Sequence, residues 1–289
     1  MSLYPSESTA AALKVTLASC QAKKQRGERI TCLTAYDYPF ARLLDEAGID
    51  LLLVGDSWAM AAAGQENTLA VTLDEMLLAT RSVRRAARRA MVVADMPYGS
   101  YHLNPEQAVA NALRLVKEAG AEAVKLEGGA VRAAVVRALV AAEVPVMAHI
   151  GLTPQSLNRQ SGYRVQGTSE AAAQQLRRDA RALEAAGAFA LVLEGIPREL
   201  AAVITRELSV PTIGIGAGPD CDGQVLVIHD LLGLSFRPRP KFVRPYADLA
   251  QVVRGAAEAF RQDVEAGAFP ADAESYHLPA EAKRAISIV

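Results

Sequence analysis

The sequence predicts an α/β fold, a (β/α)8 TIM barrel preceded by an N-terminal helix. Short apolar runs alternate with helical patterns eight times, at spacings that permit right-handed crossovers between parallel strands. A polar residue follows nearly every run, as in a barrel whose strands deliver side chains to one face. A doubly wound sheet, the alternative, binds ligands at a single switch point. We therefore expect one barrel domain over residues 1–289, with a C-terminal tail from about residue 268.

Composition limits the partners that the protein can have. The formal net charge is −1, so no overall field favours nucleic acid or an anionic membrane. No segment is long and apolar enough to span a bilayer, and Met1–Ala10 lacks the features of a signal peptide. Cys20, Cys32 and Cys221 have no metal-ligand spacing and indicate reduced thiols. We expect a cytoplasmic protein that binds neither nucleic acid nor membrane.

The first half of the chain contains four of the predicted strands. The segment Ser6–Ala22 is expected to form a helix that covers one end of the barrel. Thr72, with Glu75 in the first turn, predicts the start of a helix from Leu73 to about Ala90. The expected strands are Ile30–Thr34, Ile49–Val54, Met91–Ala94 and Ala123–Leu126. The other expected helices are Pro39–Ala47, Asn104 to Gly120, and Ala130–Ala142.

The second half repeats the alternation after a long loop. This loop, Gly151–Thr168, is a candidate lid, because loops of this length in compact domains are often functional. The expected strands are Val144–Ala148, Phe189–Leu193, Val210–Ile215 and Val225–Ile228. The expected helices are Ser169–Ala186, Pro197 to about Glu207, and Ala247 to about Ala266.

Chemically useful side chains follow most of the predicted strands. They are Asp56, Ser57, Asp95, Lys125, Glu127, His149 and Glu194. The loops after the strands of a barrel form one face, where active sites lie. Carboxylates that converge there repel each other unless a cation neutralises them. Oxygen ligands suit a hard ion, and Mg²⁺ fits a site that keeps positions open for water and substrate, so the sequence predicts Mg²⁺ rather than zinc.

Four of these residues carry specific interpretations. Lys125 and Glu127 lie on the same face of their strand, because side chains alternate along it. That face is expected to be the lumen, where Lys125 would bind a substrate carboxylate or an oxyanion; a salt bridge between the two residues is the structural alternative. His149 is either a structural histidine or part of the site. Glu194 is placed as a general base, with Arg198 as its alternative ion-pair partner.

Two other patterns favour structural roles. Gly214–Gly218 follows a strand as phosphate-binding loops do, but it contains no Lys, Ser or Thr, so a tight turn is favoured. A set of arginines opposite apolar residues indicates a solvated or subunit-facing surface rather than a nucleic-acid site. This set is Arg81, Arg84, Arg85, Arg88 and Arg89. A metal-bound 2-oxo acid that forms an enolate would suit the predicted site, and the residues leave the electrophile open.

Several short motifs over about residues 30–245 together carry a specific resemblance. They are Val54–Ser57, Thr68–Thr72, Val124–Gly129, His149–Gln155, Gly162–Gly167, Leu193–Pro197, Ile213–Gly218 and Asp222–Val227. In the same order, this set resembles the ketopantoate hydroxymethyltransferase family. The chain departs from the family pattern at Trp58-Ala59, Ala70 and Ser161, where the family usually has Leu-Gly, Pro and Gly. These changes leave the expected ligands in place and affect the fit of the acyl chain or the folate.

The resemblance implies an activity and its cofactors. The family transfers a hydroxymethyl group from 5,10-methylenetetrahydrofolate to 3-methyl-2-oxobutanoate and so gives 2-dehydropantoate (ketopantoate) for pantothenate biosynthesis. It has a barrel fold, uses Mg²⁺ and forms a homo-oligomer, a decamer. We therefore expect a metal-stabilised enolate that attacks the folate methylene carbon.

The resemblance also implies residue roles. Asp56 and Asp95 would be direct metal ligands, and Glu127 would join the same sphere or reach the metal through water. Together with Ser57 and Lys125, the two aspartates would contact the 2-oxo acid. The remaining two residues would act on the reacting groups: Glu194 as the base that removes the proton from C3, and His149 in support.

Two alternative functions remain at this point. One is another Mg²⁺-dependent 2-oxo-acid lyase, or a phosphoenolpyruvate-type mutase, on the same barrel. The other is an inactive barrel kept for binding or assembly. Loss of strand-end carboxylates would indicate the inactive barrel, and they are all present.

Overall fold

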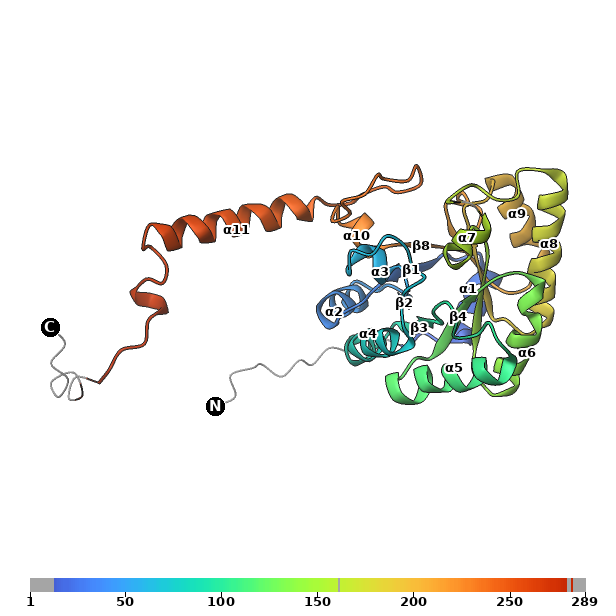
Figure 1. The fold of residues 1–289 in the computed structure, drawn as a ribbon, viewed down its shortest axis with the longest axis horizontal. Coiled ribbons are helices and arrows are strands. Elements are labelled where there is room, and N and C mark those ends of the chain that lie inside the picture. Colours follow the sequence, from blue (N-terminus) through green and yellow to red (C-terminus); the bar gives the residue numbers. More distant parts are fainter. Residues whose placement is uncertain (1–12, 161, 280–281, 283–289) are drawn as a thin grey trace.

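A computed structural model describes residues 13–160, 162–279 and 282, and it confirms the predicted barrel. Eight parallel strands follow one another in sequence order, and β8 pairs with β1 to close the ring (Figure 1). The strands are β1 Ile30–Thr34, β2 Leu51–Val54, β3 Met91–Asp95, β4 Ala123–Glu127, β5 Val146–Gly151, β6 Ala190–Glu194, β7 Thr212–Ile215 and β8 Gly223–Leu226.

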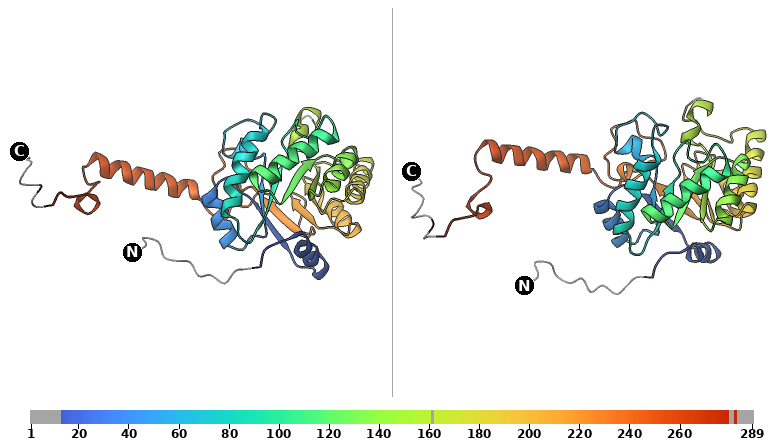
Figure 2. Two further views of the ribbon diagram at one scale, coloured as in Figure 1. Left: turned by 90° about the horizontal axis from the view of Figure 1, so that it is seen from below. Right: turned by 60° about the horizontal axis from the view of Figure 1, so that its bottom comes forward.

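Helices surround most of the ring and cover its base (Figures 1 and 2). The longer helices are α1 Leu17–Arg26, α2 Tyr38–Glu46, α4 Leu73–Ala86, α5 Pro105–Ala119, α6 Ala133–Ala141, α8 Glu170–Ala185, α9 Arg198–Glu207 and α11 Leu249–Glu265. Short helices are α3 Trp58–Ala61, α7 Leu157–Gln160 and α10 Ile228–Leu231, with 3-10 turns η1 Ala130–Arg132, η2 Pro154–Ser156 and η3 Asp272–Glu274.

The apolar core has two parts, because successive side chains of a strand point to opposite faces. One cluster fills the space between the strands and the outer helices. The other lies in the lumen and includes Met91 and Val93 of β3, Ala123 of β4, and Ala190 and Val192 of β6. The lumen is therefore packed with apolar side chains at its base and middle. On each of these strands, the next lumen-facing residue lies at the opposite end of the barrel, the mouth.

Helix α1 covers the base of the barrel, as expected, but its bounds differ from the prediction. It begins at Leu17 rather than near Ser6, because Thr16 and Ser19 form a capping box. Residues before 13 lie outside the described part of the chain. Val15 and Cys20 pack on the lumen cluster, which explains how this segment covers the barrel end.

The helix predicted from Leu73 to about Ala90 ends earlier, at Ala86. The buried carboxylate of Asp45 accepts the backbone N–H groups of Arg88, Arg89 and Ala90, and these bonds lead the chain out of the helix toward β3. The prediction of a longer helix was wrong because this contact spans over forty residues of sequence.

Helix α11 extends away from the barrel (Figures 1 and 2). It has no buried residue, and Val252, Val253, Phe260 and Val264 are exposed along it. In the described part of the chain, no helix combines the length and hydropathy that a membrane span requires.

Candidate active site

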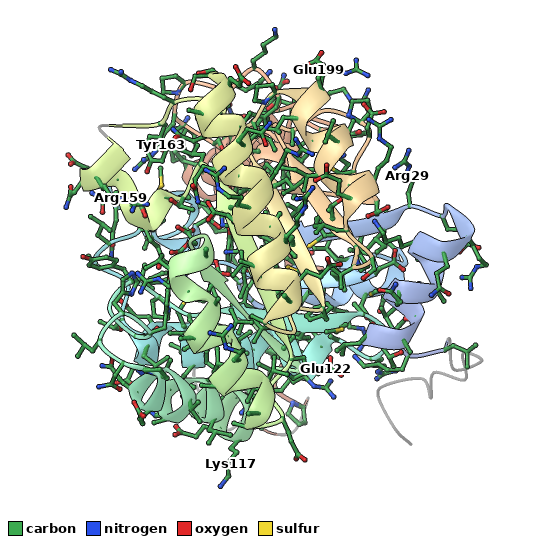
Figure 3. All side chains as sticks on the ribbon, turned by 90° about the vertical axis from the view of Figure 1, so that its right-hand side faces the viewer. Arg29, Lys117, Glu122, Arg159, Tyr163 and Glu199 are labelled. Atoms are coloured by element: carbon green, nitrogen blue, oxygen red, sulfur yellow. The ribbon has the colours of Figure 1, made fainter. Side chains whose placement is uncertain are left out.

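Strand alternation carries a series of charged side chains to the mouth of the barrel. Asp95, Lys125, Glu127, His149 and Glu194 each continue the lumen-facing series of its strand. All except Glu194 are at most 5% exposed. Register places Asp95 beside Lys125 and Glu127 beside His149 on neighbouring strands. Figure 3 shows this end of the barrel on the side of Arg159 and Tyr163, opposite Arg29 at the base.

Two aspartates and one lysine form the first part of the cluster. Asp56 follows β2, and its backbone N–H donates to Asp95 Oδ2 at 3.0 Å. Lys125 Nζ lies 2.6 Å from Asp95 Oδ1 and forms a buried ion pair. Gly55 lets the side chains of Ser57 and Asp95 lie close to the backbone at this turn, because a Cβ at this position would lie 2.7 Å from Ser57 Oγ and 3.5 Å from Asp95 Oδ2.

Glu127, His149 and Glu194 form the second part. His149 Nδ1 lies 3.4 Å from Glu127 Oε1, and its Nε2 lies 3.3 Å from Glu194 Oε2. Neither ring nitrogen makes a well-aligned hydrogen bond within the described residues. The imidazole is therefore held between two carboxylates by charge, and Glu194, at 17% side-chain exposure, is the partner that reaches the opening.

Gln155 links the two parts, and sequence reasoning missed it as a site residue. Its Nε2 donates to Asp56 Oδ2 at 2.9 Å and to the carbonyl of Met96 at 3.0 Å. Its backbone N–H donates to Glu127 Oε2 at 2.9 Å. Tyr101, which was also missed, donates its hydroxyl to Gln155 Oε1 at 2.5 Å and accepts the N–H of Glu127 at 3.1 Å. Gln155 and Tyr101 thus position two of the carboxylates.

The electrostatic balance differs between the carboxylates. Burial, and then the charges of Asp95 and Glu127, raise the pKa of Asp56 well above its usual range. Burial also acts to raise the pKa of Glu127, but His149, Lys125 and the Gln155 N–H outweigh it and lower that pKa. Mutual repulsion at Asp56 is what a bound cation would relieve.

The two basic groups of the cluster respond to the same carboxylates. Burial acts to lower the pKa of His149, but Glu127 and Glu194 outweigh it and raise that pKa to about 9. The pKa of Lys125 is raised because Asp95, Glu127 and Asp56 outweigh its burial. Both groups are therefore cationic at neutral pH.

Ser57 lies at the edge of the cluster. Its Oγ is 2.9 Å from the hydroxyl of Tyr36, which is buried. Burial is the main cause that raises the pKa of Tyr36, so this phenol stays protonated and can donate. Ser57 Oγ is thereby held beside Asp56, where a hydroxyl can donate to a bound carboxylate or carbonyl.

The donor set fits a hard divalent cation that keeps most of its positions for water and substrate. Asp95 Oδ1 is buried and has no aligned hydrogen bond besides its ion-pair contact with Lys125. Among the residues that the structure describes, no three His, Cys, Asp or Glu side chains form a closed metal-ligand group. Two carboxylates with several waters is the usual way in which proteins bind Mg²⁺. The residues present therefore fit the ion, with fewer direct protein ligands than a structural site would use.

Other predicted features lie outside the cluster. Gly216 and Gly218 have φ of 60° and 80° and pack closely on Phe242 and Arg198, which supports the tight turn. Arg198 pairs with Asp220 and not with Glu194. From the arginine set, Arg89 binds Asp50 and two backbone carbonyls at the base, which is a structural role.

Buried acids and bases that converge at the carboxyl ends of a closed parallel barrel define the class of TIM-barrel enzymes. The family model for ketopantoate hydroxymethyltransferase matches residues 14–272. The chain belongs to the ketopantoate hydroxymethyltransferase family.

Curated relatives agree with the family model. The chain is 61% identical over 276 residues to the 3-methyl-2-oxobutanoate hydroxymethyltransferase of Koribacter versatilis (strain Ellin345), covering 96% of this chain and 94% of that protein. It is 54% identical to the protein of the same name from Pelobacter propionicus, covering 91% of this chain and 98% of the relative. These relatives do not favour the lyase or mutase alternative.

Solved structures with low sequence identity share the fold. Phosphonopyruvate hydrolase in complex with oxalate and Mg²⁺ matches with a TM-score of 0.58 at 16% identity, covering 91% of this chain and 92% of that one. A 2,3-dimethylmalate lyase, described as a PEP mutase/isocitrate lyase superfamily member, matches with a TM-score of 0.57 at 20% identity, covering 90% and 91%. At these identities the likeness supports the TIM barrel alone.

Proposed function

We propose that the cluster at the mouth performs the reaction named for the family. The enzyme transfers a hydroxymethyl group from 5,10-methylenetetrahydrofolate to 3-methyl-2-oxobutanoate and gives 2-dehydropantoate. The observation that supports this best is the continuous series of contacts from Lys125 through Asp95, Asp56, Gln155, Glu127 and His149 to Glu194. It combines cation ligands, an anion anchor and a base in one small space.

The metal proposal rests on the two aspartates. Asp56 and Asp95 would hold Mg²⁺ directly, and Glu127 would act through water, because its oxygens already contact Gln155 and His149. When bound, the ion supplies a Lewis acid that polarises a 2-oxo group. The aspartates would contact the 2-oxo acid at the same place.

The chain's own groups then bind and move protons. Lys125 and Ser57 would bind the carboxylate end of 3-methyl-2-oxobutanoate and orient C3 toward Glu194. Glu194 would take the C3 proton, and the electron pair left on C3 would form a carbon–carbon bond with the carbon that the folate methylene group supplies. Water would break both C–N bonds of that carbon and provide the hydroxyl oxygen, its two protons would go to N5 and N10, and tetrahydrofolate would leave. The proton held by Glu194 would pass to the new hydroxyl oxygen. His149, as an imidazolium between Glu194 and Glu127, would orient the Glu194 carboxylate and balance the negative charge of both neighbours.

Three further properties remain proposals. The folate would be a co-substrate and not a resident group. The cytoplasmic location and the homo-oligomer, a decamer in the family, stay predictions from the sequence. The long loop from β5 fits a lid, because the Tyr163 hydroxyl contacts the Met60 sulfur of α3 and the N–H of Gln166 donates to the carbonyl of Gly195.

Solvent exchange tests the proposed function. Wild-type enzyme with Mg²⁺ and without folate should exchange the C3 proton of 3-methyl-2-oxobutanoate for deuterium, as followed by proton NMR. Exchange should stop when EDTA removes the metal. A wild-type enzyme that shows no exchange at C3 while it is folded and loaded with Mg²⁺ would count against the proposal and for another reaction on the same barrel.

A further inference from the structure

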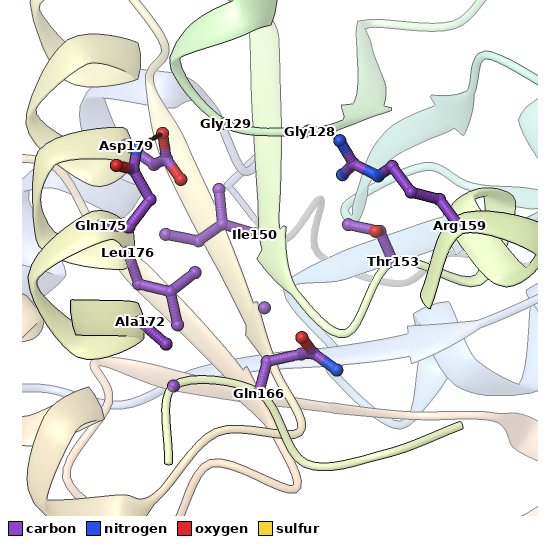
Figure 4. A pocket seen from close by; sticks show the side chains of 12 residues that line it. Gly128, Gly129, Ile150, Thr153, Arg159, Gln166, Ala172, Gln175, Leu176 and Asp179 are labelled. Atoms are coloured by element: carbon purple, nitrogen blue, oxygen red, sulfur yellow. Dashed lines mark hydrogen bonds between the residues drawn. The ribbon is translucent and has the colours of Figure 1, made fainter. Parts of the chain in front are cut away.

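A cavity of about 220 Å³ lies beside the candidate active site. Glu127 and Gln155 form the wall that it shares with the acidic cluster, and Gln155 Nε2 is 2.9 Å from Asp56 Oδ2 on that side. A second cavity of about 190 Å³, drawn in Figure 4, shares Gly128 and Arg159 with the first. In Figure 4, Arg159 lies across this second cavity from Gln175 and Asp179.

The first cavity contains cationic groups without acidic partners. Arg132 and Arg159 both line it, and among the described residues neither forms an ion pair. The Nε of Arg132 is buried and has no hydrogen-bond partner within the described residues. The Arg132 guanidinium lies 5.2 Å from the ring centroid of Tyr101, and Gly128 leaves room for its stem, because a Cβ there would lie 2.8 Å from Arg132 Cγ. Arg132 is therefore held in place with donors to spare, which suits an anionic ligand.

Aromatic groups line the same cavity. Tyr98 and His102 contact each other edge to face with centroids 4.8 Å apart, and Tyr98 is 47% exposed. Burial, and then Arg132, lower the pKa of His102 to about 4, so its ring is neutral at neutral pH. Its Nδ1 accepts the N–H of Gly99 at 3.2 Å, which leaves Nε2 as the protonated nitrogen. The cavity therefore offers aromatic rings that can pack against a flat ring of a ligand, and arginines that can bind a carboxylate.

We infer that this cavity binds the p-aminobenzoyl-glutamate end of the folate co-substrate. This inference rests on the proposed function, which requires a folate next to the 2-oxo acid. The glutamate carboxylates would bind Arg132 and Arg159, and the aminobenzoyl ring would contact Tyr98 and His102. The shared wall of Glu127 and Gln155 places the tail one side chain away from the acidic cluster, so the one-carbon end can lie at the mouth.

The test separates folate binding from chemistry on the 2-oxo acid. Arg132→Gln and Arg159→Gln should each raise the KM for 5,10-methylenetetrahydrofolate about tenfold, the loss typical of one charge-assisted hydrogen bond. The KM for 3-methyl-2-oxobutanoate should change by less than about twofold, because this substrate would bind at the acidic cluster and not to the two arginines. Free p-aminobenzoyl-glutamate should compete with the folate on wild-type enzyme and lose at least about tenfold in affinity on Arg132→Gln. Arg137→Gln, an exposed arginine on α6 outside the cavity, is the matched control.

Each result decides the inference. A folate KM within about twofold of wild type in both variants would overturn it, since the loss of a charged contact should exceed that. A parallel rise in the KM of both substrates would also overturn it, because it would indicate a structural role. Arg159 is exposed, so its variant reports on binding even if Arg132→Gln folds poorly. Failure of the proposed function is distinguishable, because the wild-type enzyme itself would then show no exchange at C3.

Discussion

The two ends of the barrel treat buried carboxylates in opposite ways. Asp50 and Asp56 lie on either side of β2, at the base and at the mouth. At the base, Asp50 contacts Lys23 at 2.7 Å and Arg89 at 2.8 Å and accepts the N–H of Thr31. At the mouth, Asp56 accepts a hydrogen bond from Gln155. The charges that affect its pKa most are those of two other carboxylates, Asp95 and Glu127.

The pKa values of these two aspartates show the consequence. Burial acts to raise the pKa of Asp50, but Lys23, the Thr31 N–H and Arg89 outweigh it and lower that pKa. Burial raises the pKa of Asp56, and Asp95 and Glu127 add to the rise. Ionised Asp50 therefore stabilises the fold, whereas ionised Asp56 opposes it. Groups that oppose folding in this way are typical of binding sites.

The same contrast extends around the ring. At the base, Glu122 pairs with Lys14 and accepts the N–H of Val92, and Asp222 pairs with Lys24 and accepts the N–H of Thr212. These contacts fasten α1 and the segment before it to the strands. In barrels the base generally carries stability and the mouth carries function, and the charges of this chain follow that division.

The largest expected effect is on catalysis at the mouth. Glu194→Gln should lower the rate of C3 deuterium exchange by about 10²–10⁴-fold, since it removes the proposed base. Mg²⁺ binding and the melting temperature should stay close to wild type. Glu199→Gln, on the exposed side of α9, is the control. Exchange at the native rate in Glu194→Gln would take the base role away from this residue.

The second effect is on stability at the base. Asp50→Asn should lower the free energy of unfolding by about 3 kcal/mol at pH 7, because it leaves Lys23 and Arg89 without their buried partner. Activity per folded molecule should not change. Asp56→Asn in metal-free buffer is the paired control and should lose much less, because it removes repulsion from Asp95 and Glu127. Equal losses of unfolding free energy in Asp50→Asn and Asp56→Asn, measured by urea unfolding, would contradict the proposed difference between the two ends of the barrel.

The contribution of Asp50, at the base of the barrel, to the free energy of unfolding should depend on pH. Asp50 has a folded pKa below its unfolded value, so its stabilisation is present above the unfolded pKa of about 3.9 and is lost as pH falls through the folded pKa. The difference in unfolding free energy between wild type and Asp50→Asn should therefore shrink below about pH 4. A difference that grows on acidification would contradict the ion-pair explanation.

A smaller effect is expected from the residue that links the site. Gln155→Leu should lower Mg²⁺ affinity or kcat/KM by about 10–100-fold, the range for residues that orient metal ligands. It leaves Asp56 Oδ2 without its donor and Tyr101 without its acceptor. Gln174→Leu on the surface of α8 controls for the change of residue type. A normal Mg²⁺ titration together with normal kinetics would make Gln155 a packing residue only.

The smallest effect is expected from a half-exposed ion pair at the base. Lys14→Ala should lower the free energy of unfolding by at most about 1 kcal/mol, because the pair with Glu122 is partly open to solvent. The loss should decrease further in 1 M salt, which screens such pairs. Thermal unfolding at low and high salt measures both. A loss of the size expected for Asp50→Asn would show that the segment before α1 depends on the contacts of Lys14 with Glu122 and with the Ala90 carbonyl.

Periodicity predicted much of this arrangement. Alternation along β4 placed Lys125 and Glu127 on one face, and the lumen cluster confirms that face. The order of strands followed from eight apolar runs separated by helical patterns. These features depend on local sequence, which is why they could be predicted.

Features that depend on distant contacts could not be predicted. Gln155 lies in a turn after Pro154, and its importance appears only when Asp56, Glu127 and Tyr101 surround it. The short end of α4 depends on Asp45 in the same way. A strand-end position marks charged residues as candidates, but it gives no comparable signal for a neutral side chain in the following loop.

The most direct test of the account is a calorimetric titration of Mg²⁺ in the presence of 3-methyl-2-oxobutanoate. We expect about one ion per chain in the wild type and at least about tenfold weaker binding in Asp95→Asn, which removes charge without volume. Asp50→Asn, which changes an aspartate at the other end of the barrel, should bind Mg²⁺ as the wild type does. Identical binding in Asp95→Asn and wild type would contradict the claim that the aspartates at the mouth hold a cation.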